Sequence, residues 1–277
     1  MRNILLFVLL ILSELTFGQN LTLMTYNIRL DVSVDKENAW PNRKDFFVSQ
    51  IRFYEPDIFG VQEARPNQVK DIDTGLKNYD YIGVGRDGKN KGEGSNVFYK
   101  KNKFEIIKSN TFWLSNTPYE VSKGWDAAYR RICTYALFKD LDNNKLFWVF
   151  NTHLDNKGEE SRIEGVKLIL SKIKELNSNN YPVFLLGDLN SIDTDNTISI
   201  IKKEMSDSME KSIEKPYGPS GTFNNFEFNK PVTLKIDYIF ISNNNKVTVN
   251  KYGVLSDSKN LRYPSDHLPI FIDVTIR

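Results

Sequence analysis

A short run of purely apolar residues, Val183 to Leu186, interrupts the mixed apolar and polar pattern of the surrounding chain. Such a run is typical of a strand that is buried on both faces. It ends in Gly-Asp-Leu-Asn at residues 187–190, and the two-residue period of a strand places Asp188 and Asn190 on the same side. These two side chains form a candidate site, although the same four residues would also suit a simple turn.

The first part of the chain shows a strand, a helix and a second strand in turn. Leu21 to Ile28 has the pattern of a strand and carries Asn27 near its end. Pro41 to Tyr54 has apolar residues at helical spacing, with proline at the start, where a helix accepts it. Asp57 to Gln62 is again strand-like, and Glu63 follows directly.

The same order returns later in the chain. Leu146 to Thr152 predicts a strand with His153 at its end, apolar residues at 163, 166, 170 and 173 predict a helix, and the buried strand before Asp188 follows. Asn27 and Glu63 are 36 residues apart, and His153 and Asp188 are 35 apart. The matching spacing suggests an internal duplication that brings polar strand ends to one rim, although helix and strand also alternate by coincidence in many α/β proteins.

The remaining elements are less regular. Glycines at 83, 85, 88, 92 and 94 match neither phosphate-binding fingerprint, so we expect a surface loop there rather than a phosphate cradle. Asn102 is a candidate hairpin turn between strands Asn96 to Lys100 and Phe104 to Ile107. Further expected elements are the strand Ile132 to Phe138, the helix Thr197 to Glu204, and the strands Lys235 to Ile241, which contains Asp237, and Ile270 to Val274.

Residues 1–18 predict a secretory signal peptide. Arg2 precedes nine apolar residues, Ile4 to Leu12, and the segment ends in the small-x-small pattern Thr16-Phe17-Gly18. A membrane span would need about 20 apolar residues, and Glu14 interrupts this run. We therefore expect an exported protein, periplasmic or secreted and without a membrane anchor, with one domain at residues 19–277.

The charge and cysteine content narrow the class of protein. The 37 basic and 35 acidic residues give a formal charge of +2, which argues against holding long nucleic acid by charge alone but does not exclude a nuclease. The single cysteine, Cys133, lies within a strand-like run and is expected to be a small buried apolar residue. An exported chain of this kind is stabilised by its core without an internal disulfide.

Both histidines of the chain, His153 and His267, lie at strand ends beside an aspartate. One such histidine would more often be structural, but Asp188, Asn190 and Glu63 lie at other strand ends and together favour a catalytic site. The chain has no Gly-x-Ser-x-Gly elbow and no histidine pair spaced for zinc. Carboxylates and carboxamides suit Mg²⁺ or Mn²⁺, which commonly serve phosphoester hydrolysis.

Six motifs, taken together and in order, resemble the endonuclease/exonuclease/phosphatase superfamily, which includes DNase I-like nucleases, deadenylases, nocturnin-like enzymes and inositol phosphatases. The exported chain is similar to a bacterial branch near the deadenylase group. The motifs are Thr25-Tyr26-Asn27-Ile28, Asp57-Ile58-Phe59-Gly60-Val61-Gln62-Glu63, Asn151-Thr152-His153-Leu154-Asp155, Gly187-Asp188-Leu189-Asn190, Ile236-Asp237-Tyr238-Ile239 and Ser265-Asp266-His267-Leu268-Pro269.

The resemblance implies a four-layer α/β sandwich, with two mixed sheets face to face and helices outside. It also implies roles for the motif residues. Glu63 resembles the main metal ligand, assisted by Asn27 and Asp266. His267 resembles the general base, or the group that holds the attacking water, and Asp237 resembles the carboxylate that orients its imidazole.

The other motif residues resemble groups that handle the phosphate. Asp188 and Asn190 resemble the pair that positions the nucleophile, and His153 resembles the histidine that stabilises the transition state. Arg131 falls near a basic, phosphate-facing position. Asp155 resembles either a second-metal ligand or a structural contact.

The substrate remains open at this stage. A loop with Trp113 and Trp125, together with Trp40, suggests an aromatic rim for short single-stranded nucleic acid or a nucleotide, although buried structural tryptophans fit the pattern equally well. We expect a monomeric phosphodiesterase or nuclease, exonuclease-like, as the first reading. The alternatives are a phosphomonoesterase for a sugar or lipid headgroup, a catalytically silent binding module, and a glycosidase that uses Glu63 and Asp188.

Overall fold

The two strand, helix and strand units form as the sequence predicts. We describe residues 19–277 in a computed structural model. The first unit consists of β1 (Gln19–Asn27), α1 (Trp40–Tyr54) and β2 (Ile58–Gln62), and the second of β7 (Leu146–His153), α3 (Glu159–Leu176) and β8 (Val183–Asp188). In each unit the two strands are parallel neighbours, so their carboxyl ends lie together.

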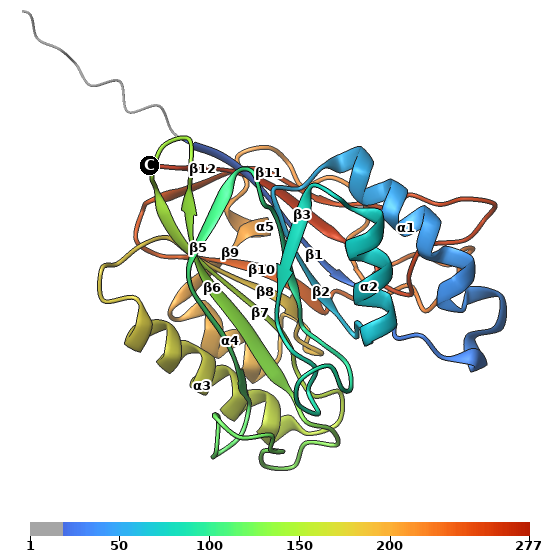
Figure 1. Cartoon of the computed structure of the whole chain (residues 1–277), viewed down its shortest axis with the longest axis horizontal. Helices are drawn as coiled ribbons and strands as arrows, with labels where there is room; N and C mark the ends of the chain where they lie inside the picture. The colour runs from blue at the N-terminus through green and yellow to red at the C-terminus, as the bar shows by residue number, and fades with distance from the viewer. Residues whose placement is uncertain (1–18) are drawn as a thin grey trace, which may run out of the picture.

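Each parallel pair forms the centre of a six-stranded sheet, and antiparallel strands complete both sheets within the described residues (Figure 1). The first sheet has the order β11 (Val247–Val254), β12 (Ile270–Ile276), β1, β2, β4 (Val97–Lys100) and β3 (Tyr79–Ile82). The second has the order β5 (Phe104–Trp113), β6 (Ile132–Asp140), β7, β8, β10 (Asp237–Ser242) and β9 (Met205–Asp207).

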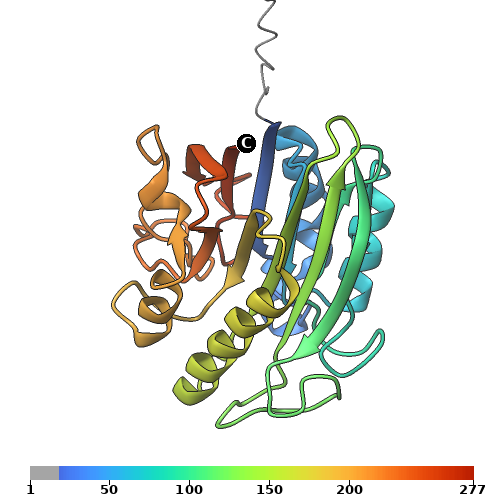
Figure 2. The same cartoon turned by 90° about the vertical axis from the view of Figure 1, so that its left-hand side faces the viewer.

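The sheets pack face to face, and helices cover both outer faces (Figures 1 and 2). One core cluster, including Leu23, Phe147 and Ile272, fills the space between the sheets. The first sheet is covered by α1 and α2 (Pro66–Gly75), and the second by α3 and α4 (Asn196–Lys202). The shorter helical elements are the 3-10 helix at Ser33–Asn38 and α5 (Ser208–Lys211). This arrangement confirms the four-layer sandwich.

A polar contact joins the two sheets close to the ends of the parallel strands. Asn151 of β7 donates from Nδ2 to the carbonyl oxygens of Val61 and Asn96, at 3.0 and 2.9 Å, and accepts from Gln62 Nε2 at 2.7 Å. A Cβ at Gly60 would lie 2.7 Å from the Asn151 side chain, so the sheets approach closely here. The fully buried Asn151 thereby fixes the position of one sheet relative to the other.

The predicted hairpin at Asn102 is wrong. β4 ends at Lys100 in the first sheet, and β5 begins at Phe104 in the second. The rings of Tyr99 and Phe104 both contact Phe138 in the core between the sheets, at centroid distances of 5.4 and 6.0 Å. Burial of both rings between the sheets therefore places β4 and β5 in different sheets. A two-stranded hairpin would have placed them side by side in one sheet.

Several elements were not anticipated from the sequence: α2, β3, β9, α5 and β11. Most of them lie at sheet edges or on the surface, where the apolar pattern is weak. The predicted signal peptide, residues 1–18, lies outside the described residues. In the described part of the chain, the helices lack the length and apolar character needed to cross a bilayer.

Candidate active site

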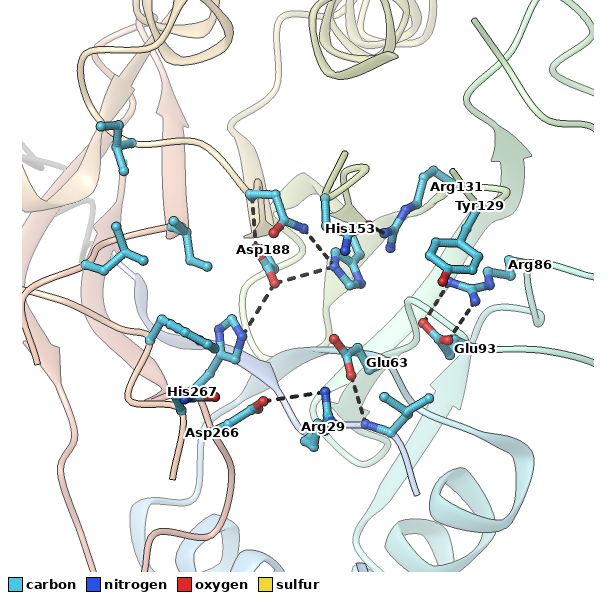
Figure 3. Close-up of a pocket in the computed structure, with 18 of the residues that line it drawn as sticks. Arg29, Glu63, Arg86, Glu93, Tyr129, Arg131, His153, Asp188, Asp266 and His267 are labelled. Carbon is cyan, nitrogen blue, oxygen red and sulfur yellow. Dashed lines mark hydrogen bonds and ion pairs between the residues drawn. The ribbon is translucent and has the colours of Figure 1, made fainter. Parts of the chain in front are cut away.

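The predicted polar strand ends meet at one edge of the two sheets. Asn27 ends β1, Glu63 follows β2, His153 ends β7 and Asp188 ends β8. Glu63, His153 and Asp188 line the cavity drawn in Figure 3, and Asn27 lies behind them in contact with Glu63 and Asp188. Gly187 permits the close pairing of β7 and β8 there, because it has φ of 146° and a Cβ would lie 1.9 Å from the Thr152 carbonyl oxygen.

Asp188 is the central carboxylate of the site. Its Oδ2 accepts from Asn27 Nδ2 at 2.8 Å, and its Oδ1 accepts from the backbone N–H of Asn190 at 2.9 Å. The same Oδ2 lies 3.5 Å from His153 Nε2 and 3.7 Å from His267 Nε2. Burial, together with the neighbouring Asp237 charge, raises the pKa of Asp188 above the usual range of an aspartate.

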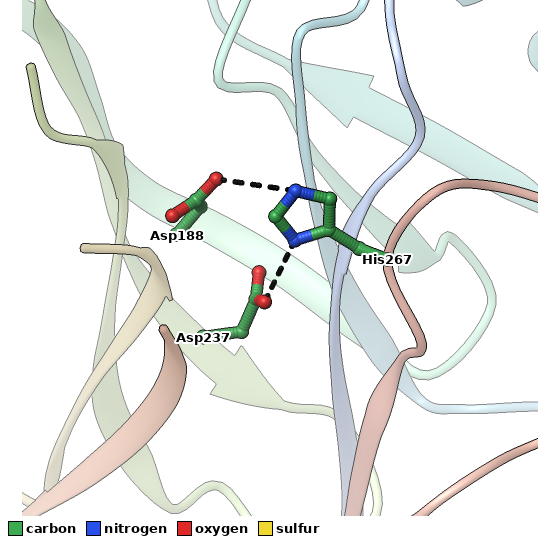
Figure 4. A group of neighbouring side chains, drawn as sticks. All are labelled: Asp188, Asp237 and His267. Atoms are coloured by element: carbon green, nitrogen blue, oxygen red, sulfur yellow. Dashed lines mark hydrogen bonds and ion pairs between the residues drawn. The ribbon is translucent and has the colours of Figure 1, made fainter. Parts of the chain in front are cut away.

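His267 is held between two carboxylates, as Figure 4 shows. Its Nδ1 lies 2.8 Å from Asp237 Oδ2, a hydrogen bond, while its Nε2 faces Asp188. Burial favours the neutral ring, but the charges of Asp237, Asp188 and Asp266 outweigh it and raise the pKa of His267. The Asp237 hydrogen bond therefore orients the imidazole and leaves Nε2 directed toward the cavity, an arrangement that fits the role implied by the family resemblance.

His153 lies on the opposite side of Asp188. Its Nε2 is 3.0 Å from Asn190 Nδ2, which also donates to the Leu154 carbonyl oxygen at 3.0 Å. Burial and the positive charges of Arg131 and His267 lower the pKa of His153 well below its usual value. His153 is therefore a neutral ring, and Asn190 is the side chain that orients it.

Glu63 and Asp266 offer the oxygen atoms that best suit a hard divalent cation. Both carboxylates line the cavity, and the Glu63 charge raises the pKa of Asp266, as burial does to a larger extent. Mg²⁺ is commonly held by one or two carboxylates, with water and substrate phosphate completing its shell, so this donor set fits the metal. Asp188, Asp237 and His267 also lie within 4.8 Å of one another, but the Asp237–His267 hydrogen bond already uses two of their atoms.

Asn27 is placed differently from the prediction that it holds the metal. Its Oδ1 accepts from the backbone N–H of Arg29 at 3.0 Å, so the oxygen is turned away from the carboxylates. Its Nδ2 donates to Glu63 Oε1 at 3.2 Å and to Asp188 Oδ2 at 2.8 Å. Asn27 therefore links the two acidic side chains in this geometry, with its oxygen engaged by the backbone.

Three residues of the site have left-handed backbone conformations: Arg29, Glu63 and Asn190, with φ of 54°, 62° and 47°. Side chains other than glycine rarely adopt this region, and such residues cluster at functional sites. The conformation of Glu63 is held by the Leu30 N–H, which donates to Glu63 Oε2 at 2.9 Å. The chain thus tolerates strain to direct these side chains toward the cavity.

Asp155 proves to be the structural contact and not a metal ligand or a substrate-binding group. Its fully buried carboxylate accepts from the backbone N–H groups of Ala128, Tyr129, Lys157 and Gly158 and pairs with Arg131 Nε at 3.2 Å. Burial opposes the charge, but these N–H groups outweigh it and lower the pKa of Asp155. Arg131 is thereby fixed in the cavity wall, and its contact with a phosphate stays a prediction.

We expect Asp155→Ala to destabilise the protein and to reduce activity. The substitution leaves Arg131 buried without its carboxylate partner, a change that typically costs about 3–5 kcal/mol of folding free energy. Denaturant unfolding would measure the loss. Asp45→Ala, which removes an exposed carboxylate on α1, is the control and should change stability by less than about 0.5 kcal/mol. Equal stability of the two variants would contradict this role.

The predicted aromatic rim does not form. Trp113 is buried, and its Nε1 donates to the Arg86 carbonyl oxygen at 2.7 Å. Trp125 packs against the core beside α3, and Trp40 is buried and donates to Asp71. None of the three tryptophans lines the main cavity. Core contacts hold all three rings, since Trp40 and Trp113 are buried and Trp125 is half-buried, so the prediction that Trp113 and Trp125 bind substrate is corrected.

Three cavity residues that sequence reasoning missed lie on the wall opposite His267: Arg86, Glu93 and Tyr129 (Figure 3). Arg86 and Glu93 belong to the glycine-rich segment that was expected to be a plain surface loop. The backbone N–H of Gly94 donates to the Ala64 carbonyl oxygen at 2.7 Å, which brings the loop beside the strand end at Glu63. This long-range contact has no signature in the sequence.

The cavity enclosed by these groups has a volume of about 830 Å³. Its charged lining includes four arginines, Arg29, Arg65, Arg86 and Arg131, along with the acidic groups described above. Apolar residues, among them Phe223 and Leu234, line another part of the wall. A cavity of this size suits a small molecule that carries an anionic group.

The comparisons with known proteins agree with this geometry. The mannosyl-6-phosphatase Bt3783 of Bacteroides thetaiotaomicron is 40% identical, with 92% of this chain and 99% of that chain covered and a TM-score of 0.87. A family protein from the same organism is 38% identical, covers 94% and 99%, and has a TM-score of 0.89. The human nocturnin catalytic domain shares the fold at 20% identity, covers 93% and 94%, and has a TM-score of 0.73. The model of the endonuclease/exonuclease/phosphatase family matches residues 24–267, and the chain belongs to this family of phosphoester hydrolases.

Proposed function

We propose that this protein is a divalent-metal-dependent phosphomonoesterase that acts on a small sugar phosphate. The hydrolytic groups surround a cavity, and the tryptophans expected to stack nucleic-acid bases do not line it, since Trp113 is buried and Trp125 is half-buried against the core. This placement of the tryptophans is the observation that carries our preference for a small monoester over the nuclease reading. The 40% identity with a mannosyl-6-phosphatase supports the same substrate class.

The attacking water is held by His267 Nε2 and Asp188 Oδ2. These atoms are 3.7 Å apart, too far for a good direct hydrogen bond but suitable for a water that contacts both. The water attacks phosphorus and gives its proton to Asp188 Oδ2, while the imidazole of His267, oriented by Asp237, holds the water beside that carboxylate. The P–O bond to the sugar breaks in line, and the alcohol leaves with a proton from solvent.

The phosphate is placed by positive and hydrogen-bonding groups. Arg131 lies on the cavity wall beside His153, and both can contact the phosphoryl oxygens. Glu63 and Asp266 would hold Mg²⁺ or Mn²⁺, which when bound neutralises charge on those oxygens. Arg29 Nη1 lies 3.8 Å from Asp266 Oδ2, so its positive charge partly compensates the negative charge of this acidic pair.

The proposal predicts metal-dependent release of inorganic phosphate from mannose 6-phosphate. Removal of metal with EDTA should lower the rate by about a thousandfold, and added Mg²⁺ or Mn²⁺ should restore it, since the metal supplies several kcal/mol of transition-state stabilisation. Bis-p-nitrophenyl phosphate, a diester, should be cleaved much more slowly.

Cleavage of the diester and of short oligonucleotides without cleavage of the monoester would favour a nuclease instead. Four arginines around the cavity make this the second candidate. Activity that survives exhaustive chelation would contradict metal dependence in either case.

A further inference from the structure

The positions of the hydrolytic groups determine where the leaving group must lie. In-line displacement places the leaving oxygen on the side of phosphorus opposite the attacking water. His267 lies at one side of the cavity, Glu63 lies between, and Arg86, Glu93 and Tyr129 lie at the far side (Figure 3). We propose that Arg86, Glu93 and Tyr129 form the leaving-group subsite and select a neutral, hydroxyl-bearing leaving group. This inference rests on the proposed function.

Tyr129 offers a fixed aromatic surface to such a group. The residue is 51% exposed although it lines the cavity. The guanidinium carbon of Arg86 lies 4.9 Å from the ring centroid and that of Arg131 lies 5.8 Å from it. The Tyr129 backbone N–H is bound by Asp155 at 3.2 Å. These contacts orient the ring before substrate arrives, so its exposed surface is available to the apolar C–H face of a sugar.

Arg86 and Glu93 add the polar half of the subsite. Their side chains form a two-pronged ion pair, with Nη2 to Oε1 at 2.7 Å and Nη1 to Oε2 at 2.8 Å. Trp113 Nε1 donates a hydrogen bond to the Arg86 carbonyl oxygen, and the Arg86 backbone N–H donates to the Glu93 carbonyl oxygen at 2.9 Å. The pair presents donors and acceptors side by side, which matches neighbouring sugar hydroxyls because each hydroxyl both donates and accepts.

The charge of this wall favours a neutral leaving group over a second phosphate. Glu93 compensates the charge of Arg86, so the pair offers no net attraction to an anion. A negative group placed there would also face Glu63, which lines the same cavity. Arg131, in contrast, lies between this wall and His153 and serves the phosphate end.

The subsite can be tested with two phosphate esters that have the same kind of leaving oxygen. Mannose 6-phosphate and propyl phosphate both release a primary alcohol, but only the first carries a ring with hydroxyls. We expect Tyr129→Ala and Glu93→Gln each to lower kcat/KM for mannose 6-phosphate about tenfold, mainly through KM, and to leave propyl phosphate within about twofold. Tyr129→Phe should behave as wild type.

Tyr217→Ala is the matched control, since Tyr217 is 71% exposed and does not line the cavity. An equal loss on both esters for Tyr129→Ala, or no loss on either, would overturn the subsite while leaving the proposed function intact. If wild type hydrolyses neither ester, the proposed function fails. Calorimetric binding of mannose 6-phosphate then decides the subsite: weaker binding by Tyr129→Ala supports it, and unchanged binding overturns it.

Discussion

His267→Ala is expected to lower kcat/KM by about three powers of ten while the fold is retained. The substitution removes the atom that holds the water beside Asp188 Oδ2, and general-base catalysis that depends on this placement contributes about 10²–10⁴-fold. It also leaves Asp237 buried without its imidazole partner, and Asp237 Oδ1 already lacks a hydrogen-bond partner among the described residues. Steady-state release of phosphate from the wild type and the variant would measure the loss.

Asp237→Asn provides the matched comparison, because it keeps the shape of the side chain and removes its charge. If the two residues act as a unit, the double variant should be little worse than His267→Ala alone. Multiplicative losses would show that Asp237 acts separately from the ring. Retention of more than a tenth of wild-type activity by His267→Ala would remove the ring from the mechanism.

Glu63→Gln should weaken Mg²⁺ binding by more than about a hundredfold and lower kcat/KM by a similar factor or more. Mutation of a group that only supports a metal ligand typically lowers metal affinity or activity about 10–100-fold. Mutation of a carboxylate that binds the ion directly should lower the affinity further. Glutamine retains the length of the side chain and an oxygen to accept from the Leu30 N–H, so the left-handed backbone at this position should survive. Calorimetric titration with Mg²⁺ measures the affinity independently of turnover.

The control for Glu63→Gln is Glu105→Gln, which removes an exposed carboxylate from β5 that does not line the cavity. It should leave both Mg²⁺ affinity and activity unchanged. Partial recovery of Glu63→Gln by excess Mn²⁺ is expected, because Asp266 and the substrate phosphate remain as ligands. Wild-type affinity for Mg²⁺ in Glu63→Gln would mean that the ion is held elsewhere, with Asp188, Asp237 and His267 as the next group to test.

Part of the hydrolytic centre was predictable because its residues lie at the ends of strands whose apolar pattern is strong. Asn27, His153 and Asp188 each end a central strand and Glu63 directly follows one, and parallel strands bring their carboxyl ends together irrespective of the loops. The sequence did not reveal what each group contacts. The orientation of the Asn27 amide and the structural role of Asp155 depend on backbone N–H groups of loops whose course has no local signature.

The substrate-facing wall could not be predicted for a related reason. A tryptophan in a predicted loop can either stack against a base or pack into the core. Here packing against the core is favoured, because burying a large ring stabilises the fold. Tyr129 and Arg86 reach the cavity only because Asp155 and Trp113 hold their backbones. Such contacts join residues far apart in the chain, and neither composition nor periodicity records them.

The contact that Asn151 makes between the sheets distinguishes the part of this enzyme whose sequence must be kept from the loops whose sequence can vary. The hydrolytic groups are divided between two sheets whose relative position that side chain fixes. The wall that faces the leaving group belongs to loops that Asn151 does not contact, at residues 83–94 and 124–130. Natural selection can therefore change the loop sequences for a new phosphate ester without disturbing the alignment of the reacting groups. In the laboratory, exchanging both loops between relatives is the corresponding route to altered substrate specificity.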